Sequence, residues 1–491
     1  AGDLEGALAD AAVALERAPQ DPAALTERAR IYAARAEWRS ASRDLSAALR
    51  ATPPARAAAR ADLLARRAWA HLALEALSEA EQDAERALEL SPRLARAQLA
   101  RAELHRRGGR LGEALRLCEQ VLAAAPWDVD ANAIRARVQL AQGKRAAALA
   151  SYQEVVELVP ARAEAWVELA LLELQLELLE RARAHFARAL ELVPDQTAWR
   201  LELSRLLERQ SDLEGAFAEA VRAAELAPRS ADAHARVGQL ARFRDDAQRA
   251  ERAFAEALAL DPTNKNALLD RATLRVDRGQ LDAALTDYRA LTERHPRFAA
   301  AFMGQGYALE RRGRPGDLEL AERSYRRARE LAPRNALNVS NLARVLQARG
   351  RLDEAERTFG EAIQLAPQRA GLRYNRGALR SARRQHQAAI ADYRKALELD
   401  PRHIHSWANL ALAQQALGRP AQAEATLQHA LGIDPRAASL WGYRGQARAA
   451  QGKLRGAISD YERYMQLLPK NDPMLPRVRA EVARLRKLLA R

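Results

Sequence analysis

Proline recurs along the chain at a fixed spacing, and this repeat constrains the fold more than any other feature of the sequence. Eleven of the thirteen intervals are 34 residues, and the exceptions are 39 (Pro53 to Pro92) and 37 (Pro296 to Pro333). An alanine stands twelve residues before every member of the series. The prolines are Pro19, Pro53, Pro92, Pro126, Pro160, Pro194, Pro228, Pro262, Pro296, Pro333, Pro367, Pro401, Pro435 and Pro469. Such self-similarity predicts short units that stack on their neighbours into one continuous core.

Each period has the pattern of two helices. In the period 336–369, the first half carries apolar residues three and four apart, as one face of a helix requires: Val339, Leu342, Ala343 and Leu346. Gly350 marks the stop between the two helices. Pro367 ends the second helix, because proline cannot continue it. Ala343 and Ala355 are expected where the two helices approach closely, since a larger side chain would overpack the crossing.

The composition supports a helical array rather than several globular domains. Of the 491 residues, 48% are hydrophobic, 29% are charged and 5% are aromatic, with alanine and arginine dominant. One cysteine, Cys118, excludes an internal disulfide and a cysteine-based zinc site. Neither an apolar run long enough for a transmembrane helix nor a signal peptide is found. A cytoplasmic location is therefore expected, or a periplasmic one if a signal precedes Ala1 in the parent.

The net charge of +15 raises the question of a nucleic-acid partner. Only six of the basic residues are lysine, and an arginine bias of this kind is typical of a GC-rich, bacterial genome. Acidic residues are interspersed with the basic ones, and the aromatics are not interleaved with arginine as a base-stacking surface requires. These patterns argue against nucleic acid as the principal partner.

The repeat resembles the tetratricopeptide repeat family, which has a 34-residue helix–turn–helix unit. The aromatic of the first helix is matched by Trp166, Phe302, Trp407 and Trp441. The small residue that follows is matched by Ala170, Gly238, Gly306, Ala343, Gly377, Ala411 and Gly445. The aromatic of the second helix is matched by Tyr152, Phe186, Phe254, Tyr288, Tyr325, Phe359, Tyr393 and Tyr461. The resemblance implies an all-α fold, a right-handed superhelical solenoid that binds ligands on its concave face.

The repeat divides the chain into three parts. Residues 1–21 match the second half of a truncated repeat, residues 22–471 hold thirteen repeats, and residues 472–491 are expected to form a capping helix. The capping helix has one apolar stripe, formed by Val478, Val482, Leu485 and Leu489. The repeats begin near Pro22, Ala61, Ala95, Val129, Ala163, Thr197, Ala231, Lys265, Ala299, Ala336, Ala370, Ile404 and Ala438. Extra residues at 56–60 are expected to extend a helix, and those in the turn 313–318 to lengthen a loop.

Motifs of catalysis, metal binding and cofactor binding are missing. The sequence holds no phosphate-binding loop, no G-x-S-x-G and no H-E-x-x-H. Nine histidines are scattered; the pairs His403/His405 and His71/His105 fit a turn and helix-packing positions. Cys118 stands at a core aromatic position, where a buried inert thiol is expected. We therefore predict no enzyme activity, no metal and no cofactor.

Function is then expected on a surface of the first helices. Counting from the first residue of each repeat, positions 4, 7, 8 and 11 form the packing stripe, and positions 2, 5, 9, 12 and 13 lie on the other side. In the family this second stripe lines the concave groove. It holds the apolar candidates Val167, Leu171 and Leu174, together with Leu140 and Leu201. Packing within or between repeats is an equally weighted alternative for these side chains.

Three asparagines, Asn341, Asn375 and Asn409, share one repeat position in successive repeats. An amide can donate to and accept from a peptide backbone. The pattern resembles the asparagine ladder in the repeat region of O-linked N-acetylglucosamine transferases. Tyr307, Tyr374 and Arg344 complete the peptide-binding candidates, with Arg344 as the expected partner of an acidic ligand side chain. The alternative is that these asparagines are only solvated helix residues.

The sequence thus predicts a scaffold or adaptor that binds proteins or extended peptides along its concave face. The alternative is the substrate-recruiting arm of a larger enzyme, such as a glycosyltransferase or a kinase. Position 5 carries no lysine in any repeat, which argues against a clamp for the tails of heat-shock chaperones. The partner and the oligomeric state are not predicted.

Overall fold

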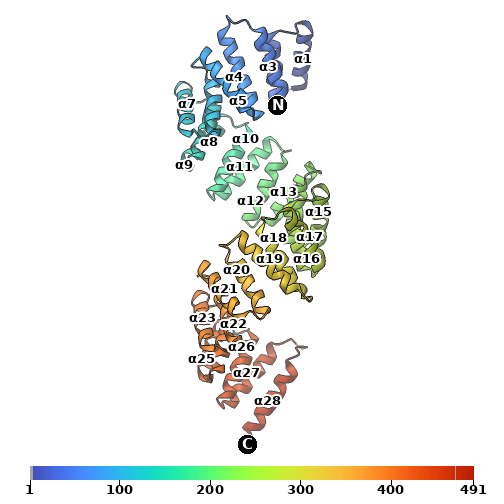
Figure 1. The fold of residues 1–491 in the computed structure, drawn as a ribbon, viewed down its shortest axis with the longest axis vertical. Helices are drawn as coiled ribbons and strands as arrows, with labels where there is room; N and C mark the ends of the chain where they lie inside the picture. The colour runs from blue at the N-terminus through green and yellow to red at the C-terminus, as the bar shows by residue number, and fades with distance from the viewer. Residues whose placement is uncertain (1–3, 470, 491) are drawn as a thin grey trace. The chain divides into compact units, whose positions relative to one another are not determined.

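A computed structural model describes residues 4–469 and 471–490 of the chain, and these residues form 28 helices and no strand (Figure 1). The helices fall into two compact units, an N-terminal unit (residues 1–229) and a C-terminal unit (residues 230–491).

The N-terminal unit begins with α1 (Leu4–Arg17), and six helix pairs follow it. The pairs are α2 (Pro22–Ala34) with α3 (Trp38–Ala51), α4 (Ala57–Ala73) with α5 (Leu77–Leu90), α6 (Ala95–Arg107) with α7 (Leu111–Ala124), α8 (Val129–Ala141) with α9 (Arg145–Leu158), α10 (Ala163–Gln175) with α11 (Leu179–Leu192), and α12 (Thr197–Arg209) with α13 (Leu213–Leu226).

The C-terminal unit contains seven helix pairs and ends with α28 (Leu475–Leu489). The pairs are α14 (Ala231–Phe243) with α15 (Ala247–Leu260), α16 (Lys265–Asp277) with α17 (Leu281–Arg294), α18 (Ala299–Arg312) with α19 (Asp317–Leu331), α20 (Ala336–Ala348) with α21 (Leu352–Leu365), α22 (Ala370–Ala382) with α23 (His386–Leu399), α24 (Ile404–Ala416) with α25 (Pro420–Ile433), and α26 (Ala438–Ala450) with α27 (Leu454–Leu467).

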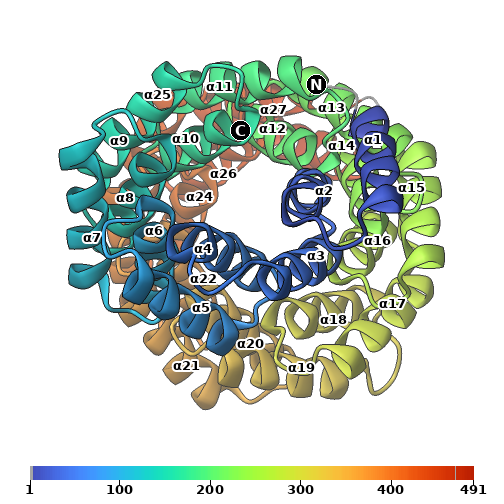
Figure 2. The same ribbon diagram turned by 90° about the horizontal axis from the view of Figure 1, so that it is seen from above.

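Within each unit the helices stack in chain order. The two helices of a pair pack on each other, and the second helix also packs on the first helix of the next pair. Figure 2 shows the even-numbered first helices on the inner side of each unit and the odd-numbered second helices on the outer side. The predicted all-α solenoid is confirmed, while its right-handed superhelix remains a prediction.

The helix ends follow the repeat, apart from the two insertions. Twelve of the thirteen residues expected to begin a repeat are the first residue of a helix. The exception is α4, which begins at Ala57 and has 17 residues, as expected for an extended helix. At the second insertion the loop spans residues 313–316, which is longer than a regular turn such as 349–351, as expected. Its extent is corrected, because Asp317 and Leu318 lie in α19. Asp317 accepts a hydrogen bond from the backbone N–H of Arg314 at 2.9 Å, and a carboxylate there stabilises a helix N-terminus.

In several pairs of the C-terminal unit, a small residue of the first helix lies beneath an aromatic ring of the second helix. A Cβ atom added at Gly238 would lie 2.6 Å from the ring of Phe254, and one at Gly377 would lie 2.8 Å from the ring of Tyr393. Phe254 and Tyr393 are fully buried. Glycine therefore sits where the second-helix ring covers the backbone of the first helix, as the spacing predicts.

Twelve of the thirteen turns inside the pairs hold one residue with a left-handed backbone, and the turn between α18 and α19 holds two, Gly313 and Gly316. Six of these turns hold glycine with φ between +72° and +76°: Gly109, Gly143, Gly279, Gly350, Gly418 and Gly452. Six others hold a residue with a side chain at φ between +58° and +64°: Ala36, Glu75, Glu177, Ser211, Asp245 and Arg384. Side chains clash with the backbone in this region, so the second group is strained.

Ser211→Gly is expected to raise the free energy of unfolding by about 0.5–1 kcal/mol, because glycine removes the clash at φ +64°. Hydrogen exchange of the amides in α12 and α13 should slow accordingly. Gly279→Ala is the matched reverse change in a regular turn, and it should speed exchange in α16 and α17. Equal exchange in Ser211→Gly and the parent chain would contradict the strain.

The last helix, α28, packs through one face, and its buried apolar stripe is shorter than predicted. Leu475, Val478, Val482 and Leu485 are buried against the preceding pair. Leu489 is 44% exposed and lies at the last residue of α28, so the buried stripe ends at Leu485. Residues 1–3, 470 and 491, which fall within the predicted parts 1–21, 22–471 and 472–491, lie outside the described residues. The division into those parts stays a prediction.

Candidate protein-binding surfaces

The inner face of the N-terminal unit contains a cavity of about 650 Å³. Its walls come mainly from the first helices α2, α4, α6 and α8. Three of its lining residues, Arg30, Trp69 and Arg137, occupy repeat position 9, which the sequence places on the groove side. The sequence pattern does not reveal this cavity, because the cavity forms only after the helices have stacked.

Charged side chains of both signs line this cavity. Asp62 accepts hydrogen bonds from Arg66 at 2.7 Å and from Arg96, in the next repeat, at 2.5 Å. Arg162 donates to Asp130 at 3.1 Å. Because one carboxylate is shared by two arginines, this wall is electropositive around Asp62.

A buried carboxylate, Glu103, lies on the same face of α6. It accepts hydrogen bonds from Arg106 at 2.6 Å and from Arg107 at 3.0 Å, and Arg137 of the next repeat lies 4.0 Å away. Burial opposes ionisation, but the hydrogen bonds from Arg106 and Arg107 outweigh it and hold the pKa of Glu103 below its ordinary value. Burial raises the pKa of Glu168, which faces the same cluster, in spite of the nearby Arg137.

The predicted apolar candidates are not equally accessible. Val167 is buried, Leu174 is half-buried and Leu171 is 39% exposed. Of their companions, Leu140 is half-buried and Leu201 is buried. Leu171 follows Arg137 by 34 residues, so it continues the position that lines the cavity in the preceding repeat.

Leu171→Ser is expected to leave the free energy of unfolding within about 0.5 kcal/mol of the parent value, because this side chain is already exposed. Its neighbour Leu172 is 1% exposed, so Leu172→Ser should cost about 2–5 kcal/mol. Denaturant unfolding of the two variants provides the comparison. An equal loss in both would place Leu171 in the core.

The three asparagines lie on successive first helices of the C-terminal unit. Asn341 is on α20, Asn375 on α22 and Asn409 on α24, and each of these helices contacts the next. All three are half-buried. Asn409 donates from Nδ2 to the hydroxyl of Tyr374 at 3.3 Å. Within residues 4–469 and 471–490, the side chains of Asn341 and Asn375 make no hydrogen bond, so both amides are available.

The remaining candidates surround these amides. Tyr374 is half-buried, and its ring centroid lies 5.0 Å from that of His403. Tyr307 is 43% exposed on α18. Arg344 is exposed, but its Nη2 donates to Glu310 at 2.9 Å. An acidic ligand would therefore have to take Arg344 from an existing ion pair.

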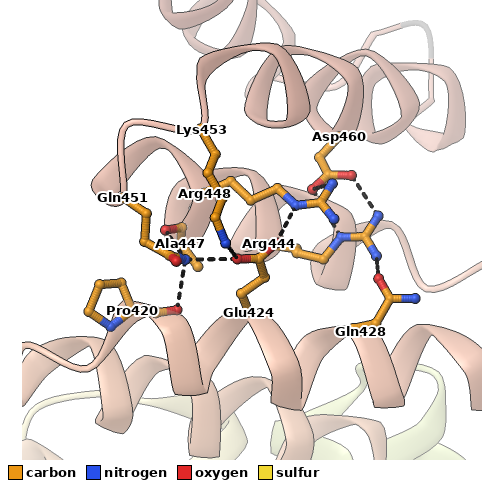
Figure 3. A network of polar contacts seen from close by, with 9 residues as sticks. All are labelled: Pro420, Glu424, Gln428, Arg444, Ala447, Arg448, Gln451, Lys453 and Asp460. Atoms are coloured by element: carbon orange, nitrogen blue, oxygen red, sulfur yellow. Dashed lines mark hydrogen bonds and ion pairs between the residues drawn. The ribbon is translucent and has the colours of Figure 1, made fainter.

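Sequence reasoning missed a network of buried ion pairs, shown in Figure 3. Arg444 donates from Nε and Nη2 to Asp460 at 2.9 and 2.7 Å, and Arg448 donates to the same carboxylate at 3.0 Å. Arg448 also donates to Glu424 of the preceding repeat at 2.8 Å. Arg444 and Asp460 are 7% and 1% exposed in their side chains. Arg448 thus joins α25 to α27.

The same network recurs in two earlier repeats of this unit. In the first, Arg271 and Arg275 donate to Asp287, and Arg275 also donates to Glu251. In the second, Arg376 and Arg380 donate to Asp392, and Arg380 also donates to Glu356. Arginines at positions 7 and 11 of the packing stripe, followed by aspartate at position 23, were the signal in the sequence. Each copy of the network connects the second helix of one repeat to both helices of the next repeat.

Glu424 gives this network a dependence on pH. Burial opposes its ionisation, but hydrogen bonds from Lys453, Arg448 and Gln451 lower its pKa to about 2. A carboxyl whose pKa falls on folding stabilises the protein above its unfolded value of about 4.3, and that contribution disappears as the pH falls toward 2.

Glu424→Gln is therefore expected to lower stability at pH 7. The gap between the parent chain and the variant should narrow between about pH 4.3 and pH 2, because both side chains are then neutral. Denaturant midpoints measured across this range provide the test. A gap that stays constant with pH would contradict the role of the charge.

The histidines and the cysteine occupy structural positions. His71 Nδ1 lies 3.2 Å from Asp83, and His403 Nδ1 accepts from the backbone N–H of Ser406 at the start of α24. Cys118 is buried, and burial raises its pKa to about 12. Across residues 4–469 and 471–490, no group of three or more His, Cys, Asp or Glu is suited to a metal ion. Over the same residues, no helix combines the length and the apolar character that a membrane crossing needs.

Comparisons with known proteins bear on the repeat. One family model, described as tetratricopeptide repeat, matches residues 65–128, 135–197, 180–231, 269–336 and 340–404, and a second with the same description matches 381–446. No curated protein matches the sequence.

Two solved structures align with most of the chain. A chain from the crystal structure of the APC/C hetero-tetramer Cut9-Hcn1 is 14% identical, with 92% of this chain and 95% of that chain covered and a TM-score of 0.43. Yeast Tom70 is 14% identical, with 96% of each chain covered and a TM-score of 0.40.

Proposed function

Because this chain belongs to the tetratricopeptide repeat family, whose repeats generally mediate protein–protein interactions, we propose that it is a scaffold or adaptor. In this proposal the inner face of its C-terminal unit binds an extended segment of a partner protein. The family models that match are repeat models only, so the proposal assigns the chain binding and no catalysis of its own. The cytoplasmic location and the bacterial origin stay predictions.

The observation that carries the proposal is the pair of available amides on neighbouring helices. Asn341 and Asn375 are half-buried, and Asn409 follows at the same position in the next repeat. An amide that has no partner in the folded chain gains a hydrogen bond when a peptide backbone reaches it, without a competing internal bond to break. Such contacts hold an extended chain irrespective of its side chains.

Aromatic side chains border the amides and provide apolar contact area. Tyr307 is exposed on α18, and Tyr374 lies beside Asn409, whose amide donates to the Tyr374 hydroxyl. Rigid aromatic side chains contribute strongly to binding because few rotatable bonds are immobilised. The N-terminal cavity, with its paired charges, would extend the binding surface to a second segment of the same partner or to a different one.

The experiment starts from peptides selected against the full-length chain from a random library of peptides about twelve residues long. Binding of a selected peptide is then measured with Asn375→Ala and with Arg357→Ala, a change on the outer helix α21. Loss of one net hydrogen bond should weaken binding by about 0.5–1.5 kcal/mol in the first variant only. Binding that is unaffected by Asn375→Ala for every selected peptide would contradict the proposed site.

A further inference from the structure

The C-terminal unit has a cavity of its own, on the side of its first helices opposite to the asparagines. A cavity of about 370 Å³ is lined by residues of α17, α18 and α19, and we name it the outer cleft. Its lining on α18 includes Phe302, Gln305 and Leu309, at the packing positions 4, 7 and 11 of the repeat. Tyr307, at position 9, belongs to the other face of the same helix.

The floor of the outer cleft is apolar, and part of it is open. Leu285 and Leu309 are buried, and Phe302 is half-buried. Leu320, on α19, is 45% exposed. The cleft adjoins the loop 313–316, in the one repeat whose period is 37 residues instead of 34. The irregular repeat therefore presents a recess with an exposed leucine at its edge.

The rim is strongly cationic. The lining includes Arg289, Arg312, Arg323 and Arg327 and no carboxylate. Arg312 is held by Asp317 and Asp282 at 2.6 and 2.8 Å. Arg327 donates to Glu330 at 2.9 Å.

Arg289 and Arg323 are exposed on opposite walls of the cleft, on α17 and α19. Over the part of the chain that the structure describes, neither of them forms an ion pair. Two uncompensated guanidinium groups therefore flank an apolar floor.

We propose that the outer cleft is a second docking site, for a partner-protein segment in which acidic side chains flank a bulky apolar one. The apolar side chain enters between Leu285, Leu309 and Leu320, and the carboxylates form bidentate hydrogen bonds with Arg289 and Arg323. The site lies outside the inner-face proposal and does not depend on it.

The charge and shape of the cleft favour this occupant over others. A second copy of the chain carries the same net charge of +15, which opposes association through a cationic rim. A phosphate-rich polymer would satisfy the arginines but leave Leu320 in water, and the lining offers no exposed aromatic for base stacking. An acidic, apolar peptide satisfies both parts of the lining.

The test uses a random library of peptides about twelve residues long, selected on the full-length chain and then counter-selected on Arg289→Glu/Arg323→Glu. The expected result is a peptide class with aspartate or glutamate beside leucine or phenylalanine. Its affinity should fall about tenfold or more in the charge-reversed variant, and Leu320→Asp should also weaken it. The matched control is Arg357→Glu/Arg394→Glu, which reverses two exposed arginines on α21 and α23. Neither arginine has an ion pair within the described residues, so this variant should retain the affinity.

Two further arms make the outcome decisive. Replacing the acids of a selected peptide with lysine should restore binding to Arg289→Glu/Arg323→Glu, since the charges are complementary again. Inorganic polyphosphate is the competing probe. The proposal is overturned if the selected peptides carry no acids, if both arginine variants bind them equally, or if only polyphosphate depends on Arg289 and Arg323. Circular dichroism and melting, unchanged by these exposed substitutions, verify the fold of each variant.

Discussion

Asp460→Ala is expected to lower the free energy of unfolding of the C-terminal unit by about 3–5 kcal/mol. The side chain is 1% exposed and accepts hydrogen bonds from both Arg444 and Arg448. Its removal leaves Arg444, 7% exposed, with Gln428 as its remaining partner. A buried guanidinium without a carboxylate has lost the free energy of hydration and has no ion pair to compensate for that loss.

The matched control is an exposed pair in the same unit. Arg486 donates to Glu462 at 2.6 Å, but these side chains are 64% and 41% exposed. Glu462→Ala should therefore cost no more than about 1 kcal/mol. Hydrogen exchange of α26 and α27 reports the loss locally, which suits a repeat protein that does not unfold in one step. Equal losses in the two variants would show that the buried network does not hold the repeats together.

The prolines and the small residues predict the fold closely because both act locally. A proline such as Pro367 ends its helix wherever it stands, and Gly377 permits the close approach of Tyr393 at a fixed spacing. Local pattern places Asp317 in the loop, whereas the structure places it at the start of α19. This difference arises because Asp317 accepts hydrogen bonds from Arg312 and Arg314, which the repeat pattern does not contain.

The ion-pair network and the two cavities could not be predicted in this way. Arg448 meets Glu424 across two repeats, and the sequence spacing of 24 residues becomes a contact only after the helices have stacked. The helical pattern predicts apolar residues at positions 7 and 11. The arginines found there interrupt that pattern, and the pattern does not indicate which carboxylates they contact. Likewise, the sequence places Arg344 correctly on its helix but does not reveal that Glu310 already binds it.

The combined change Asn341→Ala, Asn375→Ala and Asn409→Ala has the largest expected effect on binding. Each amide is expected to make one net hydrogen bond to a peptide backbone, so the triple variant should bind more weakly by about 2–4 kcal/mol if the contributions are nearly additive. The fold should barely change, because the three side chains are half-buried outside the packing stripe and alanine favours helix. Asn409→Ala also removes the hydrogen bond from Asn409 to the Tyr374 hydroxyl.

A control with the same number of changes separates binding from general surface effects. Arg357→Ala, Arg394→Ala and Arg384→Ala alter three exposed side chains in two of the same repeats, on α21, on α23 and in a turn. The structure gives none of these side chains a partner within the residues that it describes. Their removal should leave the affinity of an inner-face peptide within about threefold of the parent value.

Isothermal titration of a library-selected inner-face peptide into the full-length chain and the triple asparagine variant tests the central claim most directly. We predict that the dissociation constant rises by about 30- to 1,000-fold in the triple variant, with an unchanged melting temperature. Equal dissociation constants in the two proteins, at equal stability, would mean that the asparagines are solvated surface residues and that peptides do not bind along this face.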